Sequence, residues 1–133
     1  MDNLTNQQII EQVYWNFAEG NMQKVLSFFD PGITWVRPGG PAIPFAGTFR
    51  GYEGLGKMFA LQTAAIKLKT FLHQKICTND DTVVVLGNDT VNVISTGKTY
   101  SSDWVQAFTL KDRKIIHVQV YMDTKTIADA FSP

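Results

Sequence analysis

Asp89 is the residue whose type and position best suit proton-transfer chemistry. It lies in the run "VVVLGNDTVNV" (83–93), where the alternation of a strand puts it on the same face as the odd-numbered valines. Burial among apolar side chains raises the pKa of a carboxyl group and prepares it to exchange a proton near neutral pH. Two other interpretations stay open: Asp89 can be a structural partner of Arg37, or it can face solvent if a bulge at Gly87 shifts the strand register.

The side chains expected around Asp89 form an aromatic cup. The same alternation points a second group inward from three other strands: Trp35 and Arg37, then Trp104, Gln106 and Phe108, then Val118, Val120 and Met122. An aromatic cavity with few polar groups is typical of a small-molecule site, although an ordinary filled core has a similar composition. A buried Arg37 needs an anion, which either Asp89 or an acidic ligand can supply.

The remaining titratable residues give weaker signals. His73 alternates with Phe71 and can reach the cavity, but a lone strand histidine is more often exposed or bonded to a backbone carbonyl. Asp123 can be catalytic, yet a helix over 123–131 also needs an N-cap, which either Asp123 or Thr124 can supply. No cluster of His, Cys, Asp and Glu has the spacing of metal ligands, so we predict neither a metal nor a cofactor.

A glycine-rich stretch, "GTFRGYEGLGK" (47–57), is the one segment comparable to a phosphate-binding loop. Its glycines do not give G-x-G-x-x-G, and no Gly-Lys-Ser/Thr sequence follows. We therefore predict two turns in which Gly47 and Gly51 take positive φ angles, followed by a helix with Glu53 near its dipole-positive end.

The elements that must position these residues change character halfway along the chain. A 3.6-residue period predicts a helix that begins after Thr5 or Asn6 and breaks at 18–21, and further helices over 22–29 and 53–66. A turn at 30–32 and a short strand at 33–36 separate the last two. A period of two then predicts an antiparallel meander with strands at 69–77, 82–95, 100–111 and 114–123. A short helix over 123–131 follows the meander. This order indicates an α+β fold in one domain, residues 1–133.

Composition excludes several function classes. Twelve basic and twelve acidic residues cancel among 133, and the lysines are scattered, so we expect no nucleic-acid partner and no membrane partner. The N-terminal sequence lacks the features of a secretion signal, and no apolar run approaches the roughly 18 residues of a membrane span. A single cysteine, Cys77, suits a reducing compartment. We predict a soluble, cytoplasmic protein.

Three segments carry a resemblance to a known superfamily: "FAEGNMQKVLSFFDPGITWVRPGG", "PFAGTFRGYEGLGKMF" and "VVVLGNDTVNVISTGKTYSSDWVQAFTLKDRKIIHVQVYMDT". Together they resemble the nuclear transport factor 2 superfamily, and within it the SnoaL-like and ketosteroid-isomerase-like proteins, over nearly the whole chain. The resemblance implies a cone-shaped, curved antiparallel sheet packed on three N-terminal helices, the cystatin-like α+β roll, around a central hydrophobic pocket. The glycine-rich stretch would then form the pocket rim.

The resemblance also locates family functional positions in this sequence. The base of the ketosteroid isomerases falls on Arg37, and their two oxyanion-hole positions fall on Val13 and Gln106. The carboxylate of limonene epoxide hydrolases falls on Val120. Arginine cannot accept the proton and valine cannot donate a hydrogen bond, so we expect neither steroid isomerisation nor epoxide hydrolysis by those schemes.

Two functions from different classes remain. The first is a cofactor-independent acid/base isomerase or cyclase acting on a hydrophobic, oxygenated small molecule, with Asp89 and Arg37 catalytic. The second is a non-catalytic ligand-binding or accessory protein. In both, the expected ligand-binding residues are Trp35, Arg37, Phe59, His73, Trp104, Gln106, Phe108, Val120 and Met122. We also expect a homodimer through the outer sheet face, which carries Val105, Ala107, His117, Gln119 and Tyr121.

Overall fold

Local capping signals begin the first and last helices. In the computed structural model, which describes residues 4–133, α1 (Asn6–Ala18) starts after Thr5. The Thr5 hydroxyl accepts a hydrogen bond from the Gln8 N–H, and the Gln8 side chain accepts one from the Thr5 N–H. The last helix, α4 (Thr124–Phe131), starts after Asp123, whose carboxylate accepts from the Thr126 N–H. Of the candidate caps, Thr5 and Asp123 are therefore the ones used.

The expected turn at residues 30–32 is wrong. Helix α2 (Met22–Ser27) ends two residues early, and β1 (Phe29–Arg37) already includes these three residues. Asp30 Oδ2 accepts a hydrogen bond from the Gly32 N–H at 2.7 Å, as it would in a turn. The pairing of β1 with its neighbour shifts register between Phe29 and Thr34, so a bulge absorbs the turn sequence within the strand.

The glycine-rich stretch turns the chain from a short strand into a helix. β2 (Gly47–Arg50) leads directly into α3 (Gly51–Ala65). Gly47 has a φ of 135° and Gly51 a φ of 69°, which L-residues with side chains rarely adopt. Glu53 lies in the first turn of α3. The predicted positive φ angles and the position of Glu53 are confirmed.

Six strands form one mixed sheet. The long strands are β3 (Ile66–Asn79), β4 (Thr82–Val93), β5 (Thr99–Lys111) and β6 (Lys114–Met122). The strand order is β2-β1-β6-β5-β4-β3, and every pair is antiparallel except β1 with β6. The predicted α+β class is confirmed, with the parallel pair as an addition.

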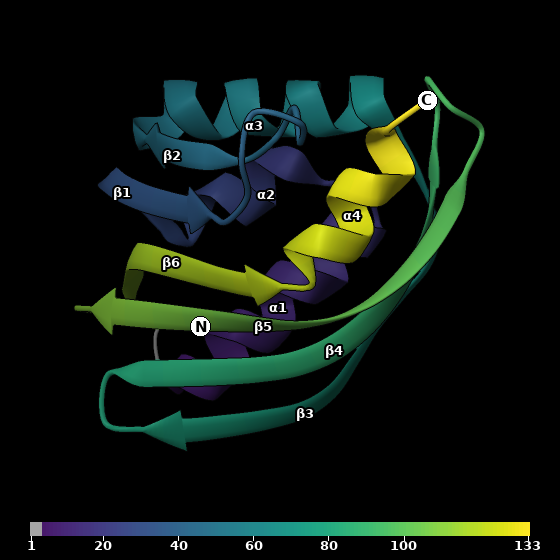
Figure 1. Ribbon diagram of the computed structural model, residues 1–133. Coiled ribbons are helices and arrows are strands. Elements are labelled where there is room, and N and C mark those ends of the chain that lie inside the picture. Colours follow the sequence, from purple (N-terminus) through teal and green to yellow (C-terminus); the bar gives the residue numbers. More distant parts are fainter. Residues whose placement is uncertain (1–3) are drawn as a thin grey trace.

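The sheet curves strongly along its long strands (Figure 1). β3 shifts register against β4 at two places, between Leu68 and Thr70 and between His73 and Lys75, and such irregularities let long strands bend. Helix α3 contacts β1 and β2, α1 contacts β3 and β4, and α4 contacts β5. Two clusters of buried apolar residues result, a large one under α1 and α3 and a smaller one under α4. In the part of the chain described, no helix is long and apolar enough to cross a bilayer.

Candidate functional site

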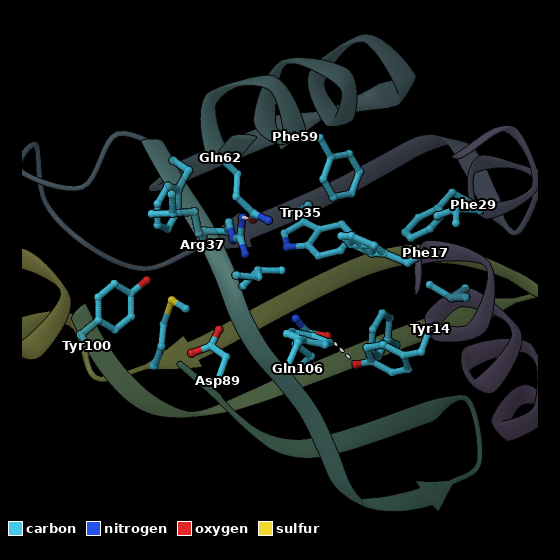
Figure 2. Close-up of a pocket in the computed structure, with 18 residues that line it drawn as sticks. Tyr14, Phe17, Phe29, Trp35, Arg37, Phe59, Gln62, Asp89, Tyr100 and Gln106 are labelled. Atoms are coloured by element: carbon cyan, nitrogen blue, oxygen red, sulfur yellow. Dashed lines mark hydrogen bonds between the residues drawn. The ribbon is translucent and has the colours of Figure 1, made fainter. Parts of the chain in front are cut away.

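A largely apolar cavity lies between the inner face of the sheet and helices α1 and α3 (Figure 2). Most of its 18 lining residues are aliphatic or aromatic. Five elements contribute the polar lining, which consists of Tyr14, Arg37, Gln62, Asp89, Tyr100 and Gln106. Such an arrangement can orient a small ligand. Within residues 4–133, no group of three or more His, Cys, Asp or Glu side chains is placed to hold a metal ion.

The Arg37 guanidinium is held in the cavity by neutral partners. Its Nη1 donates a hydrogen bond to the side-chain oxygen of Gln62 on α3, and its Cζ lies 5.1 Å from the centre of the Phe45 ring. Burial lowers the pKa of Arg37 to about 10, while interactions with Tyr100 and Asp89 act in the opposite direction. Arg37 is therefore charged at neutral pH.

Asp89 faces the same space from β4. Its side chain follows Val83 and Val85 on the inner face of the strand, and the residue is only 7% exposed, which excludes the solvent-facing interpretation. Burial raises the pKa of Asp89 to about 6, and the Arg37 charge partly opposes this shift. The single ion pair found in residues 4–133 joins Lys125 to Asp129. Arg37 and Asp89 thus influence each other across the cavity without forming a salt bridge.

Three polar atoms of the cavity lining are buried without a hydrogen-bond partner in the described chain. They are the Trp35 indole Nε1, the Arg37 Nε and the Asp89 Oδ1. The Trp35 indole turns its nitrogen toward Arg37, and the Asp89 carboxyl group lies across the cavity from both (Figure 2). The cavity therefore presents two donors on β1 opposite one carboxyl group on β4.

A buried tyrosine and a buried glutamine are hydrogen-bonded to each other in the same cavity. The Tyr14 hydroxyl on α1 donates a 2.5 Å hydrogen bond to Gln106 Oε1 on β5 (Figure 2). Burial raises the pKa of Tyr14, so the hydroxyl keeps its proton. Because the amide oxygen is occupied, Gln106 has its NH₂ group left to donate. Val13, the oxyanion-hole position assigned by resemblance, also lines the cavity but has no polar group, and the neighbouring Tyr14 is the residue of α1 whose hydroxyl enters it.

Most of the residues expected from the sequence meet at this cavity. The predicted site residues that line it are Trp35, Arg37, Phe59, Asp89, Gln106, Phe108 and Met122. Trp104 and Val120 do not line it, and they are 2% and 0% exposed within the core. Alternation correctly gives the face of the strand to which they belong, but it cannot say where that face borders open space.

His73 lies beside the main cavity. It lines an adjoining hollow that shares Tyr14, Phe17, Leu68 and Phe71 with the cavity lining. Its ring stacks on that of Tyr14, with 5.0 Å between the ring centres. The predicted ligand contact of His73 would therefore be made in the adjoining hollow and not in the main cavity.

Sequence reasoning missed several lining residues. Tyr100 could have been found, because it shares strand parity with Trp104 and Gln106. Gln62 lies on α3, and nothing in the sequence pairs it with Arg37. Tyr14 carried no separate signal, since the helix period does not show which residue of an apolar face meets which strand.

The fold and the cavity define a class: an α+β cone whose curved sheet and helices enclose an apolar pocket. The SnoaL-like domain family matches residues 10–118, and the chain belongs to this family. A search of curated protein sequences gave no match.

Solved structures of NTF2-like proteins share the fold. One from Burkholderia xenovorans is 28% identical, with a TM-score of 0.88 over 96% of this chain and 95% of that one. Another, from Burkholderia thailandensis, is 23% identical, with a TM-score of 0.89 over 98% and 99%. TerC, co-crystallized with polyporic acid, is 25% identical, with a TM-score of 0.82 over 95% and 97%.

Proposed function

We propose that the protein is a cofactor-independent acid/base isomerase or cyclase acting on a hydrophobic, oxygenated small molecule. The observation that carries this proposal is Asp89: a carboxyl group buried in an apolar cavity, with a pKa of about 6. A general base works best when its pKa lies near the working pH. TerC was co-crystallized with polyporic acid, which supports an oxygenated organic molecule as the ligand class.

The arrangement of polar groups fits the transfer of a proton between carbon atoms. Ionised Asp89 would take a proton from a carbon next to a carbonyl, and the C–H electron pair would move onto the carbonyl oxygen. Arg37 and the Gln106 amide would stabilise that negative oxygen. In an isomerisation, protonated Asp89 would return the proton to another carbon. In a cyclisation, the enolate carbon would bond to a second carbonyl carbon of the same molecule, the C=O electron pair would move onto that oxygen, and Asp89 would give its proton to it. A positioned base of this kind contributes about 100- to 10,000-fold in rate.

A non-catalytic binding or accessory protein is the second candidate. The observation that favours it is the replacement of acidic or hydrogen-bonding family residues by Arg37, Val13 and Val120. The same pocket would then hold a ligand without changing it. A ligand that binds in the pocket and is not converted, whether or not Asp89 is present, would distinguish this function from catalysis.

Exchange of carbon-bound protons tests the proposal without knowledge of the substrate. Purified protein is incubated in D₂O with a panel of carbon acids (β-diketones, β-keto esters, enones and hydroxyquinones), and loss of C–H signals is followed by NMR. We expect exchange of at least one member, slowed about 100-fold or more in Asp89→Asn. Asp103→Asn is the matched control, because Asp103 is exposed on the opposite face of the sheet. Equal exchange in wild type and Asp89→Asn, or binding of panel members with no exchange, would favour the accessory function.

We also propose that two copies pair through the outer face of the sheet. Leu86, Val105 and Tyr121 lie directly opposite one another on three neighbouring strands. Leu86 is 39% exposed and Tyr121 57% exposed. Ala107 and Gln119 form the adjoining row. An apolar row of this kind on an open sheet face is typical of a protein interface.

A further inference from the structure

Some polar atoms of the cavity lining have no hydrogen-bond partner within residues 4–133. Arg37 has a neutral amide and an aromatic face as its neighbours, and its Nε has no acceptor in the described chain. Trp35, two residues earlier on the same face of β1, is 6% exposed and has an indole N–H without an acceptor. Buried donors normally have partners, and a missing partner costs free energy. Two unmatched donors side by side therefore indicate an acceptor that the ligand supplies.

Charge decides which kind of acceptor fits. A buried guanidinium is stable when an anion compensates it, and no carboxylate within residues 4–133 contacts Arg37. Among the described residues, Asp89 is the one carboxyl group that lines the cavity, and it lies across from Arg37 without contact. An anionic oxygen would satisfy the charge of Arg37 and both free N–H groups together, which a neutral carbonyl oxygen cannot do.

We infer that the cavity binds the anion of an oxygen acid, a carboxylate or an ionised enol, whose negative oxygens accept hydrogen bonds from Arg37 Nε and Trp35 Nε1. Its apolar body lies among the rings of Phe59, Phe17 and Tyr14. This inference rests on the proposed function only in taking the cavity as the ligand site. It does not require Asp89 to catalyse a reaction.

A second consequence follows from the position of Asp89. The other titratable groups that line the cavity are Arg37 from β1, Tyr100 from β5 and Tyr14 from α1. Helix α3 and strand β6 contribute Gln62 and Met122 to the lining, and β3 carries His73 in the adjoining hollow. Tyr14 and Tyr100 are neutral, because burial raises the pKa of each. An arriving negative charge would therefore raise the pKa of Asp89 further, since it offsets the positive charge of Arg37. Binding of an anion near pH 7 should then take up a proton onto Asp89.

Two pairs of probes test the inference by titration calorimetry. 2-Naphthoate is compared with its neutral isostere 2-naphthamide, and ionised 2-hydroxy-1,4-naphthoquinone is compared with neutral 2-methyl-1,4-naphthoquinone. In at least one pair, we expect the anion to bind roughly ten- to hundredfold more tightly, as for hydrogen bonds to charged groups. The pair that responds distinguishes a carboxylate from an enol ligand. Repeating the titration at pH 7 in buffers of different ionisation enthalpy should show uptake of up to one proton.

Variants assign the effect to individual side chains. Arg37→Met should abolish the preference for the anion, whereas Arg50→Met, which removes an exposed arginine on β2, should leave it unchanged. Asp89→Asn should keep the preference and lose the proton uptake. The wild-type measurements decide the question even if Arg37→Met does not fold.

Three results would overturn the inference: neutral probes that bind as tightly as the anions, an anion preference that survives in folded Arg37→Met, or no binding of either anion at millimolar concentration. Anion binding with proton uptake, but without carbon-proton exchange in the D₂O experiment, would instead reject catalysis and leave the anion site in place.

Discussion

Replacing Asp89 by asparagine should stabilise the folded protein at neutral pH and have little effect on its stability in acid. Asparagine has nearly the shape of a protonated aspartate and never ionises. In the wild-type protein, burial in the cavity raises the pKa of Asp89 from 3.8 to about 6. The folded state therefore holds a proton that the unfolded chain has already released between about pH 4 and pH 6. The free energy of unfolding falls as the pH rises through that window and stays at the lower level above it.

The size of the effect follows from the shift. A displacement of about two pKa units corresponds to about 3 kcal/mol lost by the wild-type protein between pH 4 and pH 7.5. Asp89→Asn avoids this loss, so its advantage over the wild type should grow from near zero at pH 4 to about 3 kcal/mol at pH 7.5. Other titrating groups contribute to both proteins and cancel in the difference.

Urea denaturation measured from pH 4 to pH 8 provides the assay. The wild type and Asp89→Asn are compared at each pH, with Asp103→Asn as the control for loss of an exposed carboxylate. The advantage of Asp89→Asn over the wild type should grow with pH. A stability difference that is flat across this range would mean that Asp89 titrates normally. A variant less stable than the wild type at pH 7.5 would mean that the ionised carboxylate stabilises the fold. Either result would refute the argument from burial.

Two further predictions concern the charge pair and the outer face. Arg37→Met removes the charge that partly offsets ionised Asp89, so at pH 8 it should destabilise the protein more on its own than when it is combined with Asp89→Asn. The coupling free energy in a double-mutant denaturation cycle should be about 0.5–3 kcal/mol. Additive effects would show that the two side chains do not interact. Light scattering of the wild-type protein at micromolar concentration should give twice the chain mass of 14.9 kDa. Tyr121→Lys should shift the measured mass toward that of the monomer. A wild-type mass of 14.9 kDa would contradict the proposed interface.

The period of the sequence predicts much of the fold because burial of one face acts locally. Alternation in β4 and β5 correctly buries Asp89, Gln106 and Phe108, since a strand with one face against the core keeps its parity along its length. The sequence also predicts the positive φ angles of Gly47 and Gly51, because these angles depend on the local chain alone.

Long-range pairing accounts for what the sequence does not reveal. Residues 30–32 have the composition of a turn, yet they belong to β1, whose partner β6 lies some eighty residues away along the chain. The contacts of Tyr14 with Gln106 and of Arg37 with Gln62 likewise join a helix to a strand. Such pairs depend on how helices are seated on the sheet, which no local period encodes.

The central place of β6 in the sheet has a consequence for the order in which the protein can assemble. Within residues 4–133, β6 is the last strand in sequence order. It joins β1, which carries Trp35 and Arg37, to the β5-β4-β3 meander, which carries Gln106 and Asp89. During synthesis, both walls of the cavity emerge from the ribosome before the strand that joins them. Closing this sheet requires contacts between distant parts of the chain, which form slowly. The cavity is therefore among the last features to form. Until β6 pairs, the nascent chain exposes the inner-face aromatic residues and the unpaired edges of β1 and β5. Exposed apolar surface and unpaired strand edges are the features that chaperones bind and through which chains aggregate.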